Sequence, residues 1–325
     1  MKKTPIFLLS SIIVIIIVAL TIYLNLNKPK NYKIAVLNYS PAAEHALPGL
    51  VKGLSSNGYT QGKNLEIVYN GYFKDKNLLK EEGKRLLLLK PDLIYSMSTP
   101  ATLVMKELTA ESQIPVIFGP VSNPAKVGIV KEMKVPGGNI TGVTFGPQEP
   151  LRLEMLLKFI PDLNDILVPY NPNDKSPVIG VKLIKETAKR LGVNIHTIEV
   201  TSVKELKSKL NGYNGSFDAI FVPTDSILVS QTPYIAQYAI SKNIPFTCPQ
   251  REGVKAGALF SYGFSIEDVG MQAARLVHMV LSGTDPGSIP IELSDFTLSI
   301  NLKTSEDIGI EIPNYLLKNT FLVRE

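Results

Sequence analysis

The chain has 325 residues, of which 45% are hydrophobic and 19% charged, so it can bury one large core or two medium ones and lacks the composition of a disordered protein. Its net charge of +5 gives no independent case for nucleic-acid binding, because part of that charge comes from lysines that flank the N-terminal apolar segment described next. The single cysteine, Cys248, excludes a disulfide framework and a cysteine metal site.

The first 30 residues predict a membrane anchor or a secretory signal. Lys2 and Lys3 precede a run of uncharged, mostly aliphatic residues at 6–24, and further lysines follow it. Signal peptides usually have a shorter apolar centre and a small-x-small cleavage site, whereas this run is long enough to span hydrocarbon. We therefore expect an uncleaved anchor in the cell membrane, with the first lysines cytoplasmic and the binding domain extracytoplasmic. If the segment is cleaved, the protein is instead secreted or periplasmic.

Beyond residue 30, short apolar strands alternate with helices. The strands are continuous apolar runs and do not alternate with polar residues, which indicates parallel strands covered on both faces. The first series of predicted elements comprises strands at 33–39, 65–69, 92–97, 115–121 and 139–145, and helices at 48–57, 77–89 and 101–110.

A second series then begins, after a boundary that we place near Gly146 and Pro147. It comprises strands at 165–171, 194–200, 218–223, 245–248 and 257–263, and helices at 151–159, 178–191, 203–211 and 232–242. Single domains seldom grow this large, so two successive series predict an α/β protein with two doubly wound parallel-sheet lobes, at 31–145 and 146–263.

Two such lobes form a cleft, and ligands in these folds bind outside the carboxyl ends of the strands. Ser98 and Thr99 follow the strand at 92–97. We expect Thr99 to be the N-cap of the next helix and Pro100 to lie in its first turn, which leaves free N–H groups that attract an anion. The alternative is that Thr99 only caps its helix.

The second lobe has Thr224 and Asp225 directly after its strand at 218–223. A carboxylate that faces an anion seat across the cleft is complementary to a zwitterion. The alternative for Asp225 is an ordinary turn or cap residue.

Other side chains also lie at predicted strand ends. Tyr39 and Ser40 end the first strand of the first lobe, and Tyr170 and Asn171 end the first strand of the second. Aromatic residues at such ends can stack on a ligand or pack in the core or rim. Those in question are Phe118, Phe145, Tyr262 and Phe264.

A set of short segments, in order along the chain, resembles the ABC transporter substrate-binding family that includes tryptophan and tyrosine binders. The segments are GYTQGKNLEIVYN (58–70), PDLIYSMSTPAT (91–102), IPVIFGPVSNPAKVGIV (114–130), PGGNITGVT (136–144), PYNPND (169–174), FDAIFVPTDS (217–226), GALFSYG (257–263), and IN (300–301) with GIEIP (309–313).

The resemblance implies a solute-binding protein whose two lobes are joined by three crossings, with 264–290 returning to the first lobe and 291–325 to the second. It implies delivery of a small ligand, an amino acid, to an ABC permease driven by a cytoplasmic ATPase, with no cofactor and no nucleic acid. In amino-acid binders of this family the Ser-Thr-Pro segment holds the ligand carboxylate and the aspartate holds its ammonium. The expected ligand-binding residues are Tyr39, Ser40, Ser98, Thr99, Phe118, Asn123, Thr144, Tyr170, Asn171, Thr224, Asp225 and Tyr262.

The sequence departs from the family pattern near the expected side-chain pocket. Asn123 stands where the family commonly has an aspartate, and 173–177 reads Asn-Asp-Lys-Ser-Pro where the family often has Gly-Glu-x-Asn-Ser. Ser226 replaces the usual asparagine after the aspartate. We therefore expect amino-acid binding to transfer more securely than aromatic specificity.

Two alternatives stay open. An enzyme is disfavoured because His45, His196 and His278 are widely separated and no Gly-x-Ser-x-Gly elbow or nucleotide loop occurs. An anchored sensor that reports its ligand to a membrane partner would need the same closing lobes, so the sequence does not distinguish sensing from uptake.

Overall fold

The computed structural model describes residues 30–318 and 320–324. The apolar run at 6–24, on which the membrane-anchor prediction rests, lies outside these residues. Within them, every helix is too short or too polar to cross a membrane.

The first lobe is built on a sheet whose strands all run parallel, in the order β11-β5-β4-β3-β1-β2. Its strands are β1 (Tyr32–Asn38), β2 (Leu65–Val68), β3 (Leu93–Met97), β4 (Val116–Val121), β5 (Ile140–Thr144) and β11 (Glu292–Leu293). Its helices are η1 (Pro41–His45), α2 (Ala46–Ser56), α3 (Lys76–Leu88), α4 (Thr99–Leu108), α11 (Ile266–Leu281) and η2 (Pro286–Ser288).

Helices cover both faces of this sheet, as the apolar strands require. Leu50 of α2 and Val277 of α11 belong to the core on one face, and Leu86 of α3 and Met105 of α4 belong to the core on the other. Helices α2 and α11 approach so closely that a Cβ on Gly270 would lie 1.9 Å from the Ala46 carbonyl oxygen. A larger residue at Gly270 would therefore push the two helices apart.

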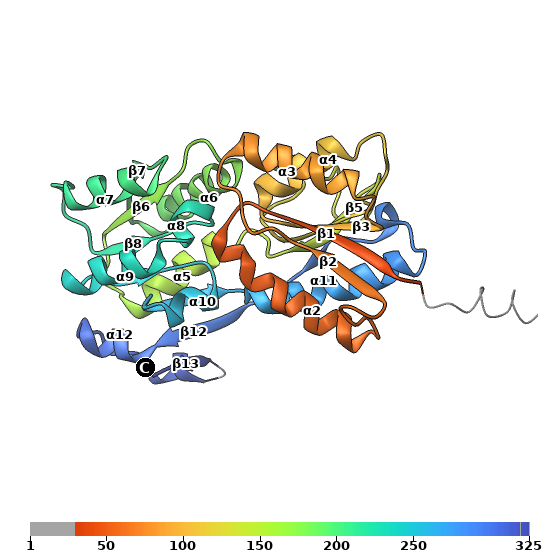
Figure 1. The fold of residues 1–325 in the computed structure, drawn as a ribbon. Coiled ribbons are helices and arrows are strands. Elements are labelled where there is room, and N and C mark those ends of the chain that lie inside the picture. The colour runs from red at the N-terminus through yellow and green to blue at the C-terminus, as the bar shows by residue number, and fades with distance from the viewer. Residues whose placement is uncertain (1–29, 319, 325) are drawn as a thin grey trace, which may run out of the picture.

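The second lobe has the strand order β13-β12-β10-β9-β8-β6-β7. Figure 1 labels β6, β7, β8, β12 and β13 of this sheet. Its strands are β6 (Asp165–Tyr170), β7 (Asn194–Glu199), β8 (Ala219–Phe221), β9 (Phe246–Thr247), β10 (Phe260–Gly263), β12 (Thr297–Asn301) and β13 (Phe321–Val323). Its helices are α5 (Glu149–Phe159), α6 (Lys175–Leu191), α7 (Val203–Asn211), α8 (Ser226–Val229), α9 (Thr232–Ser241), α10 (Arg251–Lys255), α12 (Leu302–Asp307) and η3 (Asn314–Leu317). The pairs are parallel except β10 with β12, which is antiparallel.

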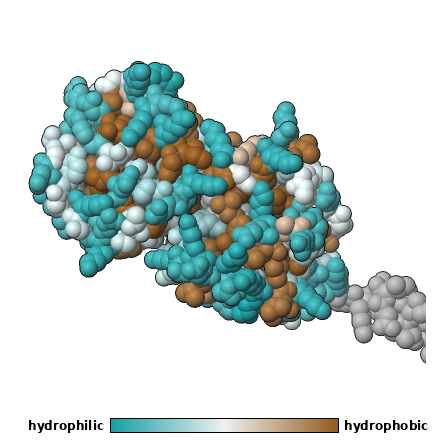
Figure 2. Space-filling model, turned by 90° about the horizontal axis from the view of Figure 1, so that it is seen from above, coloured by the Kyte–Doolittle hydropathy of each residue, from teal (hydrophilic) through white to brown (hydrophobic). Residues whose placement is uncertain are grey.

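In residues 30–318 and 320–324 the chain passes between the two sheets three times: from β5 to α5, from β10 to α11, and from β11 to β12. The last passage follows Leu293, a few residues later than the boundary expected at 290, because Glu292 and Leu293 pair with β5 of the first sheet. Figure 2 shows the lobes from above as two rounded bodies in contact. The predicted α/β fold with two parallel-sheet lobes is confirmed.

Candidate functional site

A cavity of about 50 Å³ lies between the lobes, at the carboxyl ends of strands from both sheets. This volume holds only a few water molecules. The first lobe contributes Ser40, Ser98, Thr99, Ser122, Phe145 and Phe264 to its wall, and the second contributes Asp174, Ser176, Thr224, Asp225, Ser226 and Gln250. We call it the inter-lobe cavity.

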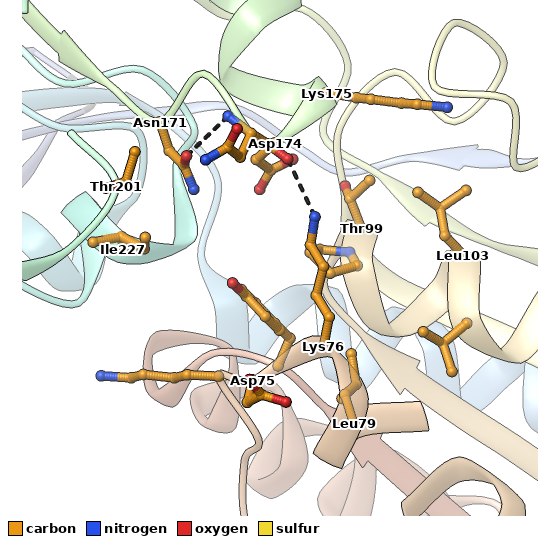
Figure 3. A pocket seen from close by; sticks show the side chains of 15 residues that line it. Asp75, Lys76, Leu79, Thr99, Leu103, Asn171, Asp174, Lys175, Thr201 and Ile227 are labelled. Carbon is orange, nitrogen blue, oxygen red and sulfur yellow. Dashed lines mark hydrogen bonds between the residues drawn. The ribbon is translucent and has the colours of Figure 1, made fainter. Parts of the chain in front are cut away.

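The lobes contact each other directly beside this cavity. Ser40 Oγ of the first lobe donates a hydrogen bond to the Ser226 carbonyl oxygen at 3.3 Å. Lys76 Nζ, from the start of α3, donates to the Asn173 carbonyl oxygen at 3.3 Å (Figure 3). The structure therefore holds the lobes close together beside the inter-lobe cavity.

The N-terminus of α4 forms one wall of the cavity. Its N-cap is Ser98 and not Thr99 as predicted, and no side chain caps its first-turn N–H groups. Ser98 has φ 86°, a conformation that costs a non-glycine residue about 1–3 kcal/mol and is concentrated at functional sites. Its Oγ is buried and has no hydrogen-bond partner in the described chain. This wall therefore presents unsatisfied donors to a ligand.

Asp225 forms the opposite wall and is only 1% exposed. Its Oδ1 accepts from the N–H groups of Ile227 (2.9 Å) and Leu228 (3.1 Å), and its Oδ2 accepts from that of Asn171 (2.7 Å). Asp225 is thus the N-cap of α8 as well as a cavity residue. Burial, and then the charge of Asp174, raise its pKa to about 7.

Asp174 and Ser176 are cavity residues that the sequence reasoning missed. Asp174 is the N-cap of α6, and its Oδ1 accepts from the Ser176 N–H at 3.0 Å. Burial raises the pKa of Asp174. Ser176 Oγ is buried and has no partner in the described chain. The sequence position of Asp174 could have identified it, because Asp174 lies between the end of a strand and the start of a helix, as Asp225 does.

The aromatic residues at the cavity are Phe145 and Phe264, whose rings stack at 4.1 Å with an interplanar angle of 6°. Both lie on passages between the lobes. Phe118, which was expected to bind ligand, does not line the cavity: it sits in the middle of β4, is 0% exposed and belongs to the first-lobe core. The neighbouring cavity residues on that segment are Pro120 and Ser122.

Four other expected residues also lie outside the cavity wall. Thr144 Oγ1 donates to the Val121 carbonyl, and Asn123 Nδ2 donates to Ser122 Oγ. The Tyr170 hydroxyl donates a hydrogen bond to Glu199. The centre of the Tyr262 ring lies 6.2 Å from that of the Phe296 ring.

A larger cavity of about 670 Å³ adjoins the first, with which it shares Thr99 and Asp174. Tyr39 and Asn171, both expected at the site, line this outer cavity. Figure 3 shows Lys76 reaching across it from α3 and Lys175 pointing away from its centre. The two cavities together bring Tyr39, Ser40, Ser98, Thr99, Asn171, Thr224 and Asp225 of the expected set to one place.

Comparison with known proteins gives close relatives over most of the chain. The "Tyrosine-binding protein" of Clostridioides difficile (strain R20291) is 29% identical over 285 residues, which cover 87% of this chain and 82% of that protein. A solved ABC domain in complex with L-Trp from Streptococcus pneumoniae is 27% identical, covers 91% of this chain and 100% of its own, and has a TM-score of 0.84.

A third relative bears on the lobe arrangement. The ligand-free, open structure of a substrate-binding protein with adhesive properties from Clostridium difficile is also 27% identical, covers 91% of this chain and 99% of its own, and has a TM-score of 0.69. Identity and coverage are alike for these two solved structures, and the chain is more similar to the L-Trp complex than to the ligand-free, open structure.

The family model described as ABC transporter substrate binding protein matches residues 33–324. This is a family of solute-binding proteins and not of enzymes, which removes the enzyme alternative. The chain therefore belongs to the ABC transporter substrate-binding protein family.

Proposed function

We propose that this chain is the solute-binding subunit of an ABC importer and that it captures an amino acid as a zwitterion in the inter-lobe cavity. The proposal rests on one observation: two walls of the inter-lobe cavity face each other, one rich in hydrogen-bond donors and the other containing carboxylates. One wall is the uncapped N-terminus of α4 with the unpartnered Ser98 hydroxyl, and the other contains the half-buried carboxylate of Asp174 and the buried carboxylate of Asp225.

Each half of a zwitterion has a matching partner in this arrangement. The ligand carboxylate lies against Ser98 and the first turn of α4, where N–H donors and the positive end of the helix dipole favour an anion. The ligand ammonium lies between Asp174 and Asp225. A buried carboxylate with a second carboxylate beside it is costly without a cation, and an ammonium offsets that cost.

The cavity volumes suggest where the ligand side chain goes. The inter-lobe cavity, about 50 Å³, suits an amino-acid head group but leaves no room for a large side chain. The outer cavity continues from it past Thr99 and Asp174 and offers about 670 Å³. Aromatic amino acids are the first candidates, because the named relatives bind tyrosine and tryptophan.

We propose hinge closure as the mechanism of capture. A ligand that touches both walls makes its full set of contacts only when the lobes are closed, so it stabilises the closed state through its differential affinity. If the closed state is about 1% populated without ligand, a preference of about 10⁴-fold, or roughly 5.5 kcal/mol, makes it dominant.

The proposal includes the location and the partners. The apolar run at 6–24 serves as an anchor in the cell membrane that keeps the lobes extracytoplasmic, next to a permease and its cytoplasmic ATPase. An adjacent histidine kinase gene in place of permease and ATPase genes would favour the sensor alternative.

A thermal-shift screen tests the ligand class. The purified chain, unfolded and refolded to remove carried-over ligand, is screened against the twenty amino acids, nucleosides, short peptides and sugars. A ligand at 100 times its Kd adds about 2.7 kcal/mol, which raises the Tm of a protein of this size by several degrees. A response to amino acids supports the proposal, whereas a response only to another class contradicts it.

A further inference from the structure

Two buried charged residues contact the loop that contains Thr224 and Asp225. Glu149 and Arg152 lie in the first turn of α5, directly after the first passage between the lobes, and they are 1% and 0% exposed. Replacing buried charges by apolar residues is often neutral or stabilising, so their presence calls for a role other than packing.

Their contacts hold the loop from both sides. Glu149 Oε1 accepts from Thr224 Oγ1 at 3.1 Å and from the Thr224 N–H at 3.5 Å. Arg152 Nη2 donates to the Val222 carbonyl oxygen at 2.6 Å, and its guanidinium lies 4.0 Å from the ring centre of Phe221. Burial lowers the pKa of Arg152 to about 10, while the charge of Glu149 opposes that shift, so Arg152 stays charged at neutral pH.

The residue before them ties the same cluster to the second passage. When the Gln148 side-chain amide is oriented to satisfy its neighbours, its nitrogen donates to the carbonyl oxygens of Pro249 (2.9 Å) and Tyr262 (3.2 Å), which flank the chain on its way back to the first lobe. The amide oxygen then faces Thr224 Oγ1, about 3.4 Å away, which is farther than the 3.1 Å from that hydroxyl to Glu149 Oε1. Thr224, at the front of the cluster, faces the inter-lobe cavity. The start of α5 therefore connects two of the passages to the ligand loop.

We propose that Glu149 is a positioning residue that sets the hydrogen-bonding role of Thr224 in ligand selection, an inference that rests on the proposed amino-acid function. Glu149 Oε1 accepts a hydrogen bond from the Thr224 hydroxyl group. The lone pairs of Thr224 Oγ1 then face the cavity as acceptors beside Asp225, which suits an ammonium group and disfavours a carboxylate. Arg152 holds the preceding turn of the loop, so that the hydroxyl stays in this orientation.

The test is a double-mutant cycle between Glu149 and Thr224, with Kd for L-tyrosine and L-tryptophan measured by calorimetry on the full chain. Glu149→Leu removes the acceptor, and we expect the Kd to rise at least tenfold. Glu149→Gln keeps an acceptor oxygen, and we expect it to restore most of the affinity. In a Thr224→Val background, Glu149→Leu changes the Kd less than twofold. Glu154→Gln, at an exposed position on the same helix, is the matched control and leaves the Kd unchanged.

A second measurement needs no ligand. In the Glu149→Leu and Glu149→Gln proteins, amide hydrogen exchange is followed at 224–228 and, as a reference, in β6. We expect faster exchange at 224–228 in the Glu149→Leu protein and near-wild-type exchange in the Glu149→Gln protein. Unchanged exchange in Glu149→Leu overturns the inference, and so does a lower Tm with an unchanged Kd. A wild-type chain that binds neither L-tyrosine nor L-tryptophan nor any other amino acid overturns the proposed function and, with it, the ammonium-acceptor role.

Discussion

Asp225→Asn removes one negative charge from the cavity and nearly nothing else. The amide oxygen of asparagine can replace Oδ1, which accepts from Ile227 and Leu228, so the cap of α8 survives. The hydrogen bond from the Asn171 N–H to Oδ2 is lost. That loss destabilises the fold by about 1–3 kcal/mol, and the removal of a buried carboxylate offsets part of it.

The effect on binding is larger than the effect on stability. A hydrogen bond to a charged group contributes about 1.5–3 kcal/mol, which corresponds to a roughly 10- to 150-fold rise in the Kd for an amino acid. The assay is isothermal titration calorimetry at pH 8, where the wild-type Asp225 carboxyl, with a pKa of about 7, is mostly ionised. The Tm of the variant, measured without ligand, shifts by only a few degrees.

Asp218→Asn is the matched control. Asp218 also accepts two backbone N–H groups through one oxygen, those of Asn164 and Asp165 at 2.9 Å each, but it lies just before β8, at the end away from the cavity. Its substitution leaves the Kd unchanged. An Asp225→Asn protein that binds amino acids as tightly as wild type would refute the assignment of the ammonium to this wall.

Four further predictions concern the pH dependence of affinity, the pH dependence of stability, lobe closure and backbone strain. Because burial and a neighbouring carboxylate raise the pKa of Asp225 to about 7, calorimetry should show amino-acid affinity falling as the pH drops from 8 to 6; an affinity that is flat across this range would contradict it. The same raised pKa lets the folded state hold a proton that the unfolded chain releases, so ligand-free stability in urea should fall as the pH rises from about 4 to about 7. Lys76→Met removes an inter-lobe hydrogen bond and should weaken apparent affinity a few-fold while enlarging the ligand-free molecule in small-angle scattering. Lys84→Met, at a residue whose ammonium pairs with Glu81 of the same helix and lines neither cavity, should do neither. Ser98→Gly relieves the backbone at φ 86° and should keep or raise the Tm while weakening binding; a lower Tm with unchanged affinity would contradict the role of Ser98.

The two lobes could be predicted from the sequence, because continuous apolar runs indicate buried parallel strands and the spacing between the runs leaves room for a helix after each strand. Each run that was predicted as a parallel strand needs helices on both faces, and only a repeated strand and helix series supplies them. The antiparallel pairing of β12 was not predictable in this way, because a short apolar strand has the same pattern in either direction. The short helices α8, α10 and α12 lack the length over which a helical period can be recognised.

Some residues that line the cavity could be predicted from the sequence. The position of Asp225 was predictable because a residue that follows a buried strand lies at the edge of the sheet where ligands bind in such folds. Ser98 was found, but not its strained φ or its role as the N-cap, since these depend on how the β3 to α4 turn packs. Phe118 and Phe145 show the limit for aromatic residues. Both belong to the first-lobe core, but only Phe145 also lines the cavity, and their positions relative to a strand end do not distinguish them.

A crystal structure of the chain with L-tyrosine or L-tryptophan tests the central claim most directly. The account predicts the ligand carboxylate at the start of α4, within roughly 3 Å of Ser98 Oγ or the Thr99 N–H, and the ammonium at hydrogen-bond distance from Asp225 or Asp174. The side chain should extend toward the outer cavity. A ligand bound with its ammonium toward α4, or bound away from both walls, would contradict the zwitterion assignment.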